Sequence, residues 1–183
     1  MKYSNEEIDQ YAEQAGEAKD GFQKAIEELK ADKTLSPVGK NQTADELFNE
    51  AVEKLAELRS SYNSAIQGED DRLLSAAFPK PTSGSEQLAF DDFVYRLSQD
   101  TVKPSERQAR INQGSEISAR AAAFAGQLKG DHKAVDAYAA KFPDKVEAIQ
   151  ELVSFGEKYG SNRSANTKLS EGMLFARPTR PRF

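Results

Sequence analysis

The sequence predicts an all-α protein, and three observations support this prediction. Val, Ile and Thr number 7, 6 and 6 among 183 residues, whereas Ala alone numbers 25. Few β-branched residues beside abundant Ala, Glu, Lys and Gln favour helices over strands. Apolar residues also recur at alternating spacings of three and four over long stretches, and helix-capping motifs precede two of these stretches.

The first predicted helix begins after a capping box, Ser4-Asn5-Glu6-Glu7, in which Ser4 accepts from a first-turn amide and Glu7 reaches back. The apolar residues that follow repeat as heptads, a pattern that places them on one stripe of a helix. They are Ile8, Tyr11, Ala15, Ala18, Phe22, Ala25 and Leu29.

A second box, Thr43-Ala44-Asp45-Glu46, predicts the start of a second helix after a connection that contains Pro37 and Gly39. Because two heptad helices joined by a short loop otherwise expose their apolar stripes, residues 1–67 are expected to form an antiparallel, coiled-coil-like helical hairpin. The apolar stripe of the second helix comprises Phe48, Ala51, Leu55, Leu58, Tyr62 and Ala65.

Further apolar residues lie beside the two stripes and indicate that a third helix packs on the hairpin, with the chain's own helices favoured over a partner's. These residues are Ile26, Leu47, Val52 and Ile66.

Shorter elements are expected after the hairpin. Residues 68–86 predict a short helix followed by a linker rich in Pro, Ser and Gly. Residues 87–160 contain several short amphipathic stretches separated by Pro104, Gly130 and Pro143, which are residues typical of helix ends. This segment therefore predicts a small helical bundle.

The last segment, residues 161–183, differs from the rest of the chain in charge. It carries five basic residues and one acidic residue, a net charge of +4, whereas residues 1–160 carry 20 basic and 29 acidic residues, a net charge of −9. Pro178 and Pro181 favour an extended course. We therefore expect a C-terminal arm whose candidate partner-binding residues are Leu174, Phe175, Arg177, Arg180, Arg182 and Phe183.

Three interpretations of the arm remain open at this level. It docks on a neighbouring subunit through its aromatic and arginine residues, it folds back on the acidic body or stays disordered, or it contacts nucleic-acid phosphates. The first is favoured, because a tail that only solubilises needs no apolar anchors.

Residue patterns that carry catalysis or bind metals are scarce. The chain has no Cys and a single His, which excludes disulfide scaffolds, thiolate nucleophiles and sites built from several histidines. His132 is interpreted as an exposed turn residue, and the acidic clusters at residues 69–71 and 91–92 as partners of helix ends, since neither has the spacing of a calcium loop. We expect no enzyme activity, cofactor or metal site.

These observations predict a structural or adaptor subunit of a multi-protein assembly, a kind of organisation also found in virion and phage components. The expected partners are other protein subunits, including copies of this chain. The alternative is a nucleic-acid-associated protein that contacts phosphates through the arm. The N-terminal residues lack an apolar signal core and no stretch reaches the length of a membrane span, so a cytoplasmic, soluble protein is expected.

Overall fold

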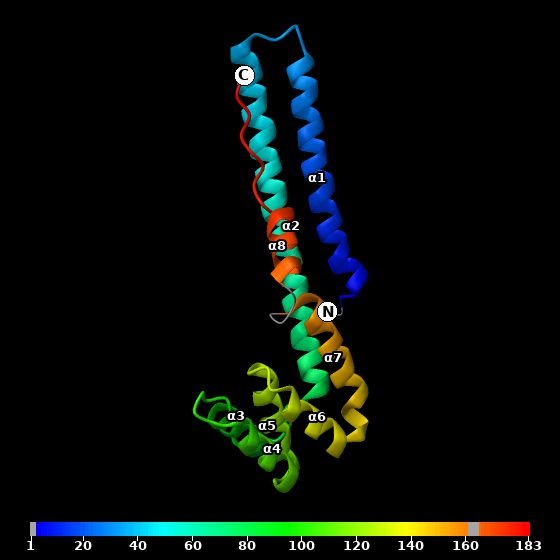
Figure 1. Ribbon diagram of the computed structural model, residues 1–183, viewed down its shortest axis with the longest axis vertical. Helices are drawn as coiled ribbons and strands as arrows, with labels where there is room; N and C mark the ends of the chain where they lie inside the picture. The colour runs from blue at the N-terminus through cyan, green and yellow to red at the C-terminus, as the bar shows by residue number, and fades with distance from the viewer. Residues whose placement is uncertain (1–2, 161–164) are drawn as a thin grey trace. The chain divides into compact units, whose positions relative to one another are not determined.

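A computed structural model describes residues 3–160 and 165–183, and every regular element in this part of the chain is helical. The prediction of an all-α protein is therefore confirmed. The described residues form two compact units (Figure 1). Unit 1 contains residues 3–69 and 165–183, and unit 2 contains residues 70–160. The two units are described separately below.

Helix α1, Asn5–Ala31, begins where the sequence predicts. The Ser4 hydroxyl accepts from the Glu7 amide at 3.2 Å, and the Glu7 carboxylate accepts from the Ser4 amide at 2.7 Å. Both halves of the capping box are thus formed, which satisfies two amides that the helix itself leaves without a partner.

Helix α2, Pro37–Ala77, begins six residues before the Thr43 box and continues past the predicted end near Gln67. Ser36 caps it, because its hydroxyl accepts from the Gly39 amide at 3.2 Å, and Pro37 takes the first helical position, where a missing N–H costs nothing. The expectation that Pro37 and Gly39 lie in a connection between the two helices is thus wrong. Gly68 and the acidic run after it lie inside the helix rather than at its end.

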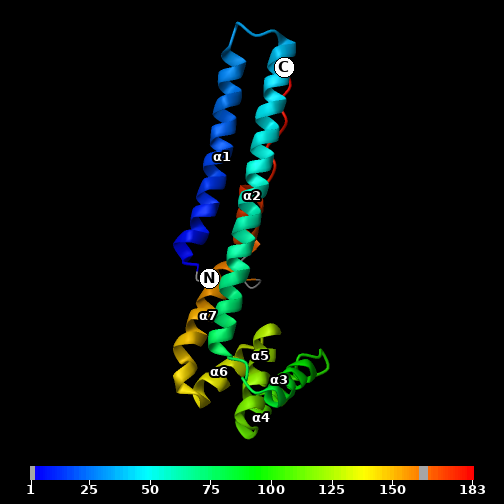
Figure 2. The same ribbon diagram turned by 180° about the vertical axis from the view of Figure 1, so that it is seen from behind.

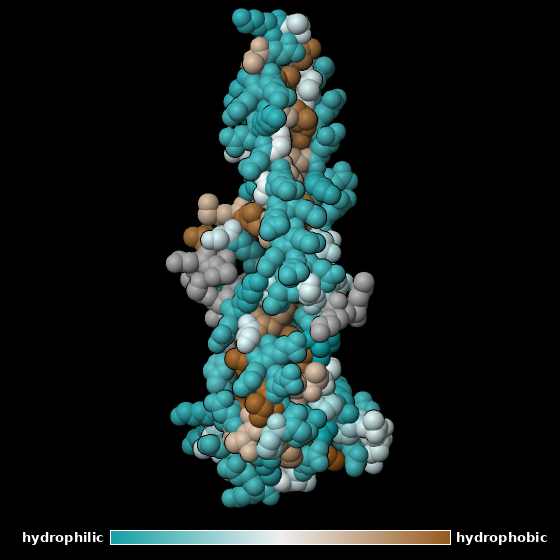
Figure 3. All heavy atoms as spheres, turned by 90° about the vertical axis from the view of Figure 1, so that its right-hand side faces the viewer, coloured by the Kyte–Doolittle hydropathy of each residue, from teal (hydrophilic) through white to brown (hydrophobic). Residues whose placement is uncertain are grey.

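Within unit 1, α1 and the first part of α2 run side by side in opposite directions (Figures 1 and 2), joined by residues 32–36. The rings of Phe22 and Phe48 meet edge to face with centroids 6.5 Å apart. Where α1 faces the viewer in Figure 3, hydrophobic atoms form only a narrow strip between hydrophilic side chains, as expected when each helix buries one stripe. The buried members of the predicted stripes are Ile8, Ala15, Leu29, Ala51, Leu55, Leu58, Tyr62 and Ala65.

The expectation that the C-terminal segment, residues 161–183, is extended is wrong for residues 165–174, which form a third helix of unit 1, α8 (Ala165–Leu174). Pro178 and Pro181 lie after its end and so do not prevent it, and residues 161–164 lie outside the described residues.

Helix α8 packs against α1. A methyl group at Gly16 of α1 would lie 3.9 Å from Leu174 Cδ1, an ordinary van der Waals distance, so the end of α8 lies directly beside α1 at this position. The chain just before α1 is fixed to α2 by the Tyr3 amide, which donates to the Glu69 carboxylate at 3.1 Å.

Unit 2 begins within the last part of α2 and contains five further α-helices and one 3₁₀ turn among its described residues. They are α3 (Gly84–Leu97), α4 (Pro104–Gln113), α5 (Glu116–Leu128), α6 (His132–Lys141), η1 (Pro143–Lys145) and α7 (Val146–Tyr159). Helix α5 is the central one, since α3, α4 and α6 all pack on it. Its five alanines between 119 and 125 are fully buried, and their small side chains let neighbours approach on several sides.

The core of unit 2 contains an aromatic cluster and a buried ion pair. Phe78 contacts Phe124 of α5 and Tyr138 of α6, with ring centroids 5.9 and 5.5 Å apart. Arg107 of α4 pairs with Asp131, the N-cap of α6, at 2.9 Å, and both side chains are only 6% exposed. The Arg107 guanidinium also donates to the backbone oxygens of Leu97 and Val102, so it is well satisfied despite its burial.

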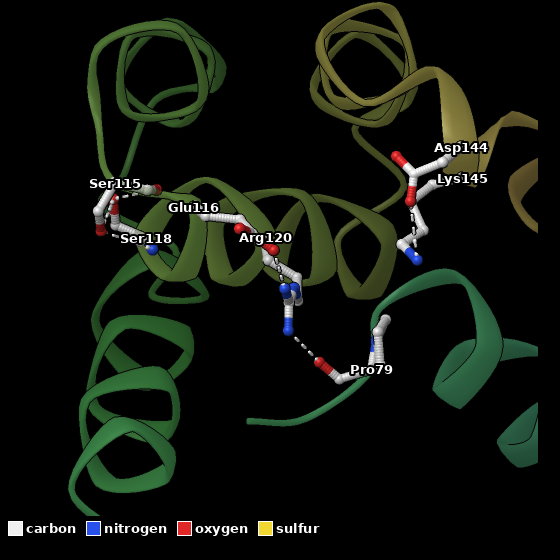
Figure 4. A network of polar contacts seen from close by, with 7 residues as sticks. All are labelled: Pro79, Ser115, Glu116, Ser118, Arg120, Asp144 and Lys145. Carbon is white, nitrogen blue, oxygen red and sulfur yellow. Dashed lines mark hydrogen bonds and ion pairs between the residues drawn. The ribbon is translucent and has the colours of Figure 1, made fainter. Parts of the chain in front are cut away.

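A second polar network lies on α5 and its neighbours (Figure 4). Arg120 donates to the Pro79 backbone oxygen at 2.6 Å and to the Glu116 carboxylate, and thereby fixes the chain after α2 to α5. Ser115 caps α5 by accepting from the Ser118 amide at 3.3 Å. These contacts stabilise the fold, and none of them involves the C-terminal arm.

Candidate interaction site

From here on, the arm means residues 175–183, the part of the predicted C-terminal arm that comes after α8. These residues run alongside α2 as an extended segment (Figures 1 and 2). Pro178 and Pro181 remove two backbone donors and fix their own φ angles, which explains why α8 does not continue. Because the arm runs opposite to α2, its successive residues meet α2 positions of decreasing number. Three points of contact along this course can be described.

The first contact is aromatic. Phe175 is 5% exposed, and its ring lies 5.2 Å from that of Tyr62 of α2, measured between centroids. Just before it, the Lys19 ammonium of α1 donates to the backbone oxygen of Met173, in the last turn of α8, where a positive charge is favoured. The start of the arm is therefore fixed to both helices of the hairpin.

The second contact combines charge with an aromatic face. The Arg180 guanidinium donates to the Asp45 carboxylate at 2.7 Å, and its central carbon lies 5.9 Å from the centre of the Phe48 ring. This hydrogen bond and the positive charge of Arg180 hold the pKa of Asp45 below its ordinary value, and Arg182 contributes through its charge. The same partner raises the pKa of Arg180.

The third contact holds Phe183. Its ring packs on an apolar cluster of Ile26, Leu29 and Ala44, and the Lys40 ammonium lies 6.0 Å from the ring centre. The Asn41 side chain makes two hydrogen bonds to the backbone of Phe183. Its oxygen accepts from the Phe183 amide at 3.0 Å, and its nitrogen donates to the Phe183 backbone oxygen at 3.2 Å. This pairing resembles that between two β-strands, with a side-chain amide in place of the second strand.

The residues that contact the arm are together named the arm-binding face. Most belong to α2 and a few to the end of α1. They are Ile26, Leu29, Lys40, Asn41, Ala44, Asp45, Phe48 and Tyr62.

Two open grooves flank the arm. One, of about 490 Å³, lies between Phe22 and Ile26 of α1 and the prolines Pro178 and Pro181. The other, of about 330 Å³, lies between Asn41, Asp45 and the last residues of the arm. After the buried Phe175, the arm rests on the surface of the hairpin, with its remaining residues exposed or half-buried.

The six candidate partner-binding residues predicted from the sequence do not share one environment in the structure. Phe175, Arg180 and Phe183 contact the arm-binding face, and Leu174 is half-buried beside Gly16. Arg177 and Arg182 are exposed. Among the interpretations left open, folding back on the chain's own acidic helices describes the arm in this structure, while docking on another subunit remains a prediction.

The receiving residues Asn41, Asp45 and Tyr62 were not identified as a site from the sequence. Asp45 was assigned to a capping box and Tyr62 to the apolar stripe of the hairpin. No sequence pattern marks the face on which a distant extended segment lies, and only the excess of acidic over basic residues before position 70 hinted at a basic partner.

Other candidate positions lie outside this site. His132 is exposed at the first position of α6. Asp70 is half-buried, and its burial, followed by the charge of Asp71, raises its pKa. Asp91 and Asp92 pair with Lys80 and Arg96 at 3.7 and 3.0 Å. Within residues 3–160 and 165–183, no group of three or more side chains of the types that ligate metals is found.

None of the described helices combines the length and apolar character that a membrane crossing requires. Comparisons with protein-family models, curated proteins and solved structures give no match. The functional argument therefore depends on the site itself.

Proposed function

We propose that this chain is a non-catalytic structural or adaptor subunit of a multi-protein assembly and works through its helical surfaces and its C-terminal arm. The observation that carries the proposal is the arm-binding face. It holds an extended segment by one aromatic contact, one ion pair and a pair of hydrogen bonds from a side-chain amide to the backbone. Proteins commonly recognise peptides in this way, with anchors in fixed places and an extended backbone between them.

Charge supports the same proposal. Residues 1–69 hold 8 basic and 15 acidic residues, a net charge of −7, whereas the arm holds three arginines and no acidic residue. Opposite charges on a segment and its receiving surface accelerate encounter and disfavour wrong partners. A virion or phage component is one kind of assembly subunit that fits this description.

The proposal is tested by the mass of the chain's complex in its native source. A tagged full-length chain is expected to co-purify in a particle heavier than its own 20.2 kDa. The variant Asn41→Arg with Asp45→Arg, at two half-buried positions of the arm-binding face, is expected to leave that particle while keeping its helical circular dichroism spectrum. A matched control, Glu53→Arg, changes an exposed charge of α2 outside the arm-binding face and is expected to stay in the particle. A chain that is recovered only at its own mass would overturn the proposal.

The alternative function, contact with nucleic acid, is favoured by one observation: the side chains of Arg177 and Arg182 are exposed. It requires that duplex DNA or RNA binds the full chain, that affinity falls steeply with salt, and that Arg177→Ala with Arg182→Ala removes the binding. Absence of binding at low salt would dismiss this alternative and leave the assembly proposal standing.

A further inference from the structure

We infer that the arm-binding face is an exchangeable contact between copies of this chain, which accepts the arm of a second copy when its own arm is displaced. This inference rests on the proposed function, because it names one partner for the surface described there. It is argued from how the arm is attached, how open the surface is, and how the charges are divided.

The arm is attached like a separate peptide. The Phe175 and Ala176 amides donate to the backbone oxygens of Glu171 and Met173, and residues 177–183 make no backbone-to-backbone hydrogen bond with any other described residue. Every contact from Arg180 onward is made by a side chain of the hairpin or of the arm. A second chain that carries the same residues can therefore make the same contacts, which is the condition for exchange of an identical element.

The surface is also open to a second arm. The grooves of about 490 and 330 Å³ border the arm, and five of its nine residues are exposed. The helices that build the face keep their own hydrogen bonds in both states. Exchange then requires only the loss and recovery of the three contacts.

Charge directs the arm of another copy to the same place. The arm carries +3 and residues 1–69 carry −7, so the displaced arm of one copy is attracted to the hairpin of the next. A flexibly tethered segment experiences an effective concentration in the millimolar range, so the chain's own arm occupies the face in dilute solution. When copies are held close together in an assembly, the arm of a neighbouring copy competes with the chain's own arm for the arm-binding face.

Two full-length variants separate the roles of arm and face. In the donor, Asn41→Arg with Asp45→Arg closes the face and leaves the arm intact. In the acceptor, Arg180→Asp with Phe183→Ala disables the arm and leaves the face intact. All four substitutions lie at exposed or half-buried positions, and circular dichroism checks that both variants stay helical.

Sedimentation equilibrium then measures the mass of each variant and of their equimolar mixture. Each variant alone is expected at 20.2 kDa, and the mixture is expected to contain a one-to-one complex of twice that mass. The donor mixed with the unaltered chain is expected to give far less complex, because the face of that chain is occupied. A mixture that stays at the mass of one chain overturns the inference.

A synthetic peptide of residues 174–183 distinguishes the failure of this inference from the failure of the proposed function. If the peptide binds the acceptor but the donor does not, the face recognises arm-like segments and only exchange between copies is wrong. If neither binds, the recognition surface on which the proposed function depends is wrong as well.

Discussion

At the scale of single residues, the contact between Asp45 and Arg180 is the polar link between arm and hairpin that titrates. Its hydrogen bond holds the pKa of Asp45 below the ordinary value of 3.8. A carboxylate with a lowered pKa in the folded state stabilises that state above its unfolded pKa, and the contribution disappears as pH falls through the lowered value. Docking of the arm is therefore expected to weaken below about pH 4.

This expectation is checked by following the Asp45 carboxyl carbon by NMR during an acid titration. The variant Arg180→Ala is expected to raise the pKa of Asp45 toward its ordinary value, because the largest cause of the shift is removed. Lys80→Ala, next to Asp91 in unit 2, serves as a control that leaves Asp45 unchanged. An Asp45 pKa that is identical in the wild-type chain and in Arg180→Ala would show that the two side chains do not meet.

The buried pair of Arg107 and Asp131 gives a second prediction at this scale. Arg107→Met leaves the Asp131 carboxylate buried without its cation, and breaking such a pair costs about 3–5 kcal/mol. Adding Asp131→Asn removes the stranded charge and keeps a side chain that caps α6, so the double variant is expected to be more stable than Arg107→Met alone. Urea denaturation measures both free energies of unfolding. Equal losses in the single and double variants would contradict the role given to the unpaired charge.

At the scale of elements, two glycines of unit 2 make a matched pair. A Cβ at Gly126 of α5 would lie 2.7 Å from the Cβ of Ala134 in α6, so Gly126→Ala is expected to destabilise by about 1–3 kcal/mol. A Cβ at Gly156 of α7 meets nothing within 4 Å, and Gly156→Ala is expected to stabilise by about 0.5–1 kcal/mol through helix propensity. Thermal unfolding compares the two, and a loss of stability in both variants would contradict this account of the approach of α5 and α6.

Elements were also the scale at which the sequence was most informative. The Ser4 box set the start of α1, and five of the six predicted stripe residues of α2 are buried, because heptad spacing records which side of a helix avoids water. The start of α2 was misplaced because Pro37 and Gly39 resemble a turn, although Ser36 and Pro37 together form a helix start. Local residue preferences alone do not decide between these two outcomes.

Of the candidate site, the sequence predicts the arm but not the residues that receive it. Composition and prolines identified the arm, and its anchors Phe175, Arg180 and Phe183 make contacts of the expected kinds. The receiving residues could not be foreseen, since Asn41 and Tyr62 lie 142 and 113 positions from the arm residues they meet. Such pairing depends on tertiary geometry, which a single sequence does not encode in any local pattern.

At the scale of the whole molecule, charge divides the chain into an acidic majority and a basic end. Salt shortens the range of this attraction from about 30 Å at 0.01 M to about 3 Å at 1 M, whereas burial of Phe175 and Phe183 does not depend on it in this way. We expect that adding salt releases part of the arm population and that substitution of both phenylalanines by Ala releases the rest. The NMR shift of the Asn41 side-chain amide measures the docked fraction. A docked fraction that does not change with salt would contradict the electrostatic part of the account.

Phe183 at the end of the arm packs on Ile26, Leu29 and Ala44 of the hairpin. Nuclear Overhauser contacts between the Phe183 ring and the Ala44 methyl group in the full chain measure this packing. We expect strong contacts in the wild-type chain and their loss in Asn41→Ala with Asp45→Ala. A Phe183 ring with the chemical shifts of a free peptide and no contact to Ala44 would show that the arm does not lie on the hairpin.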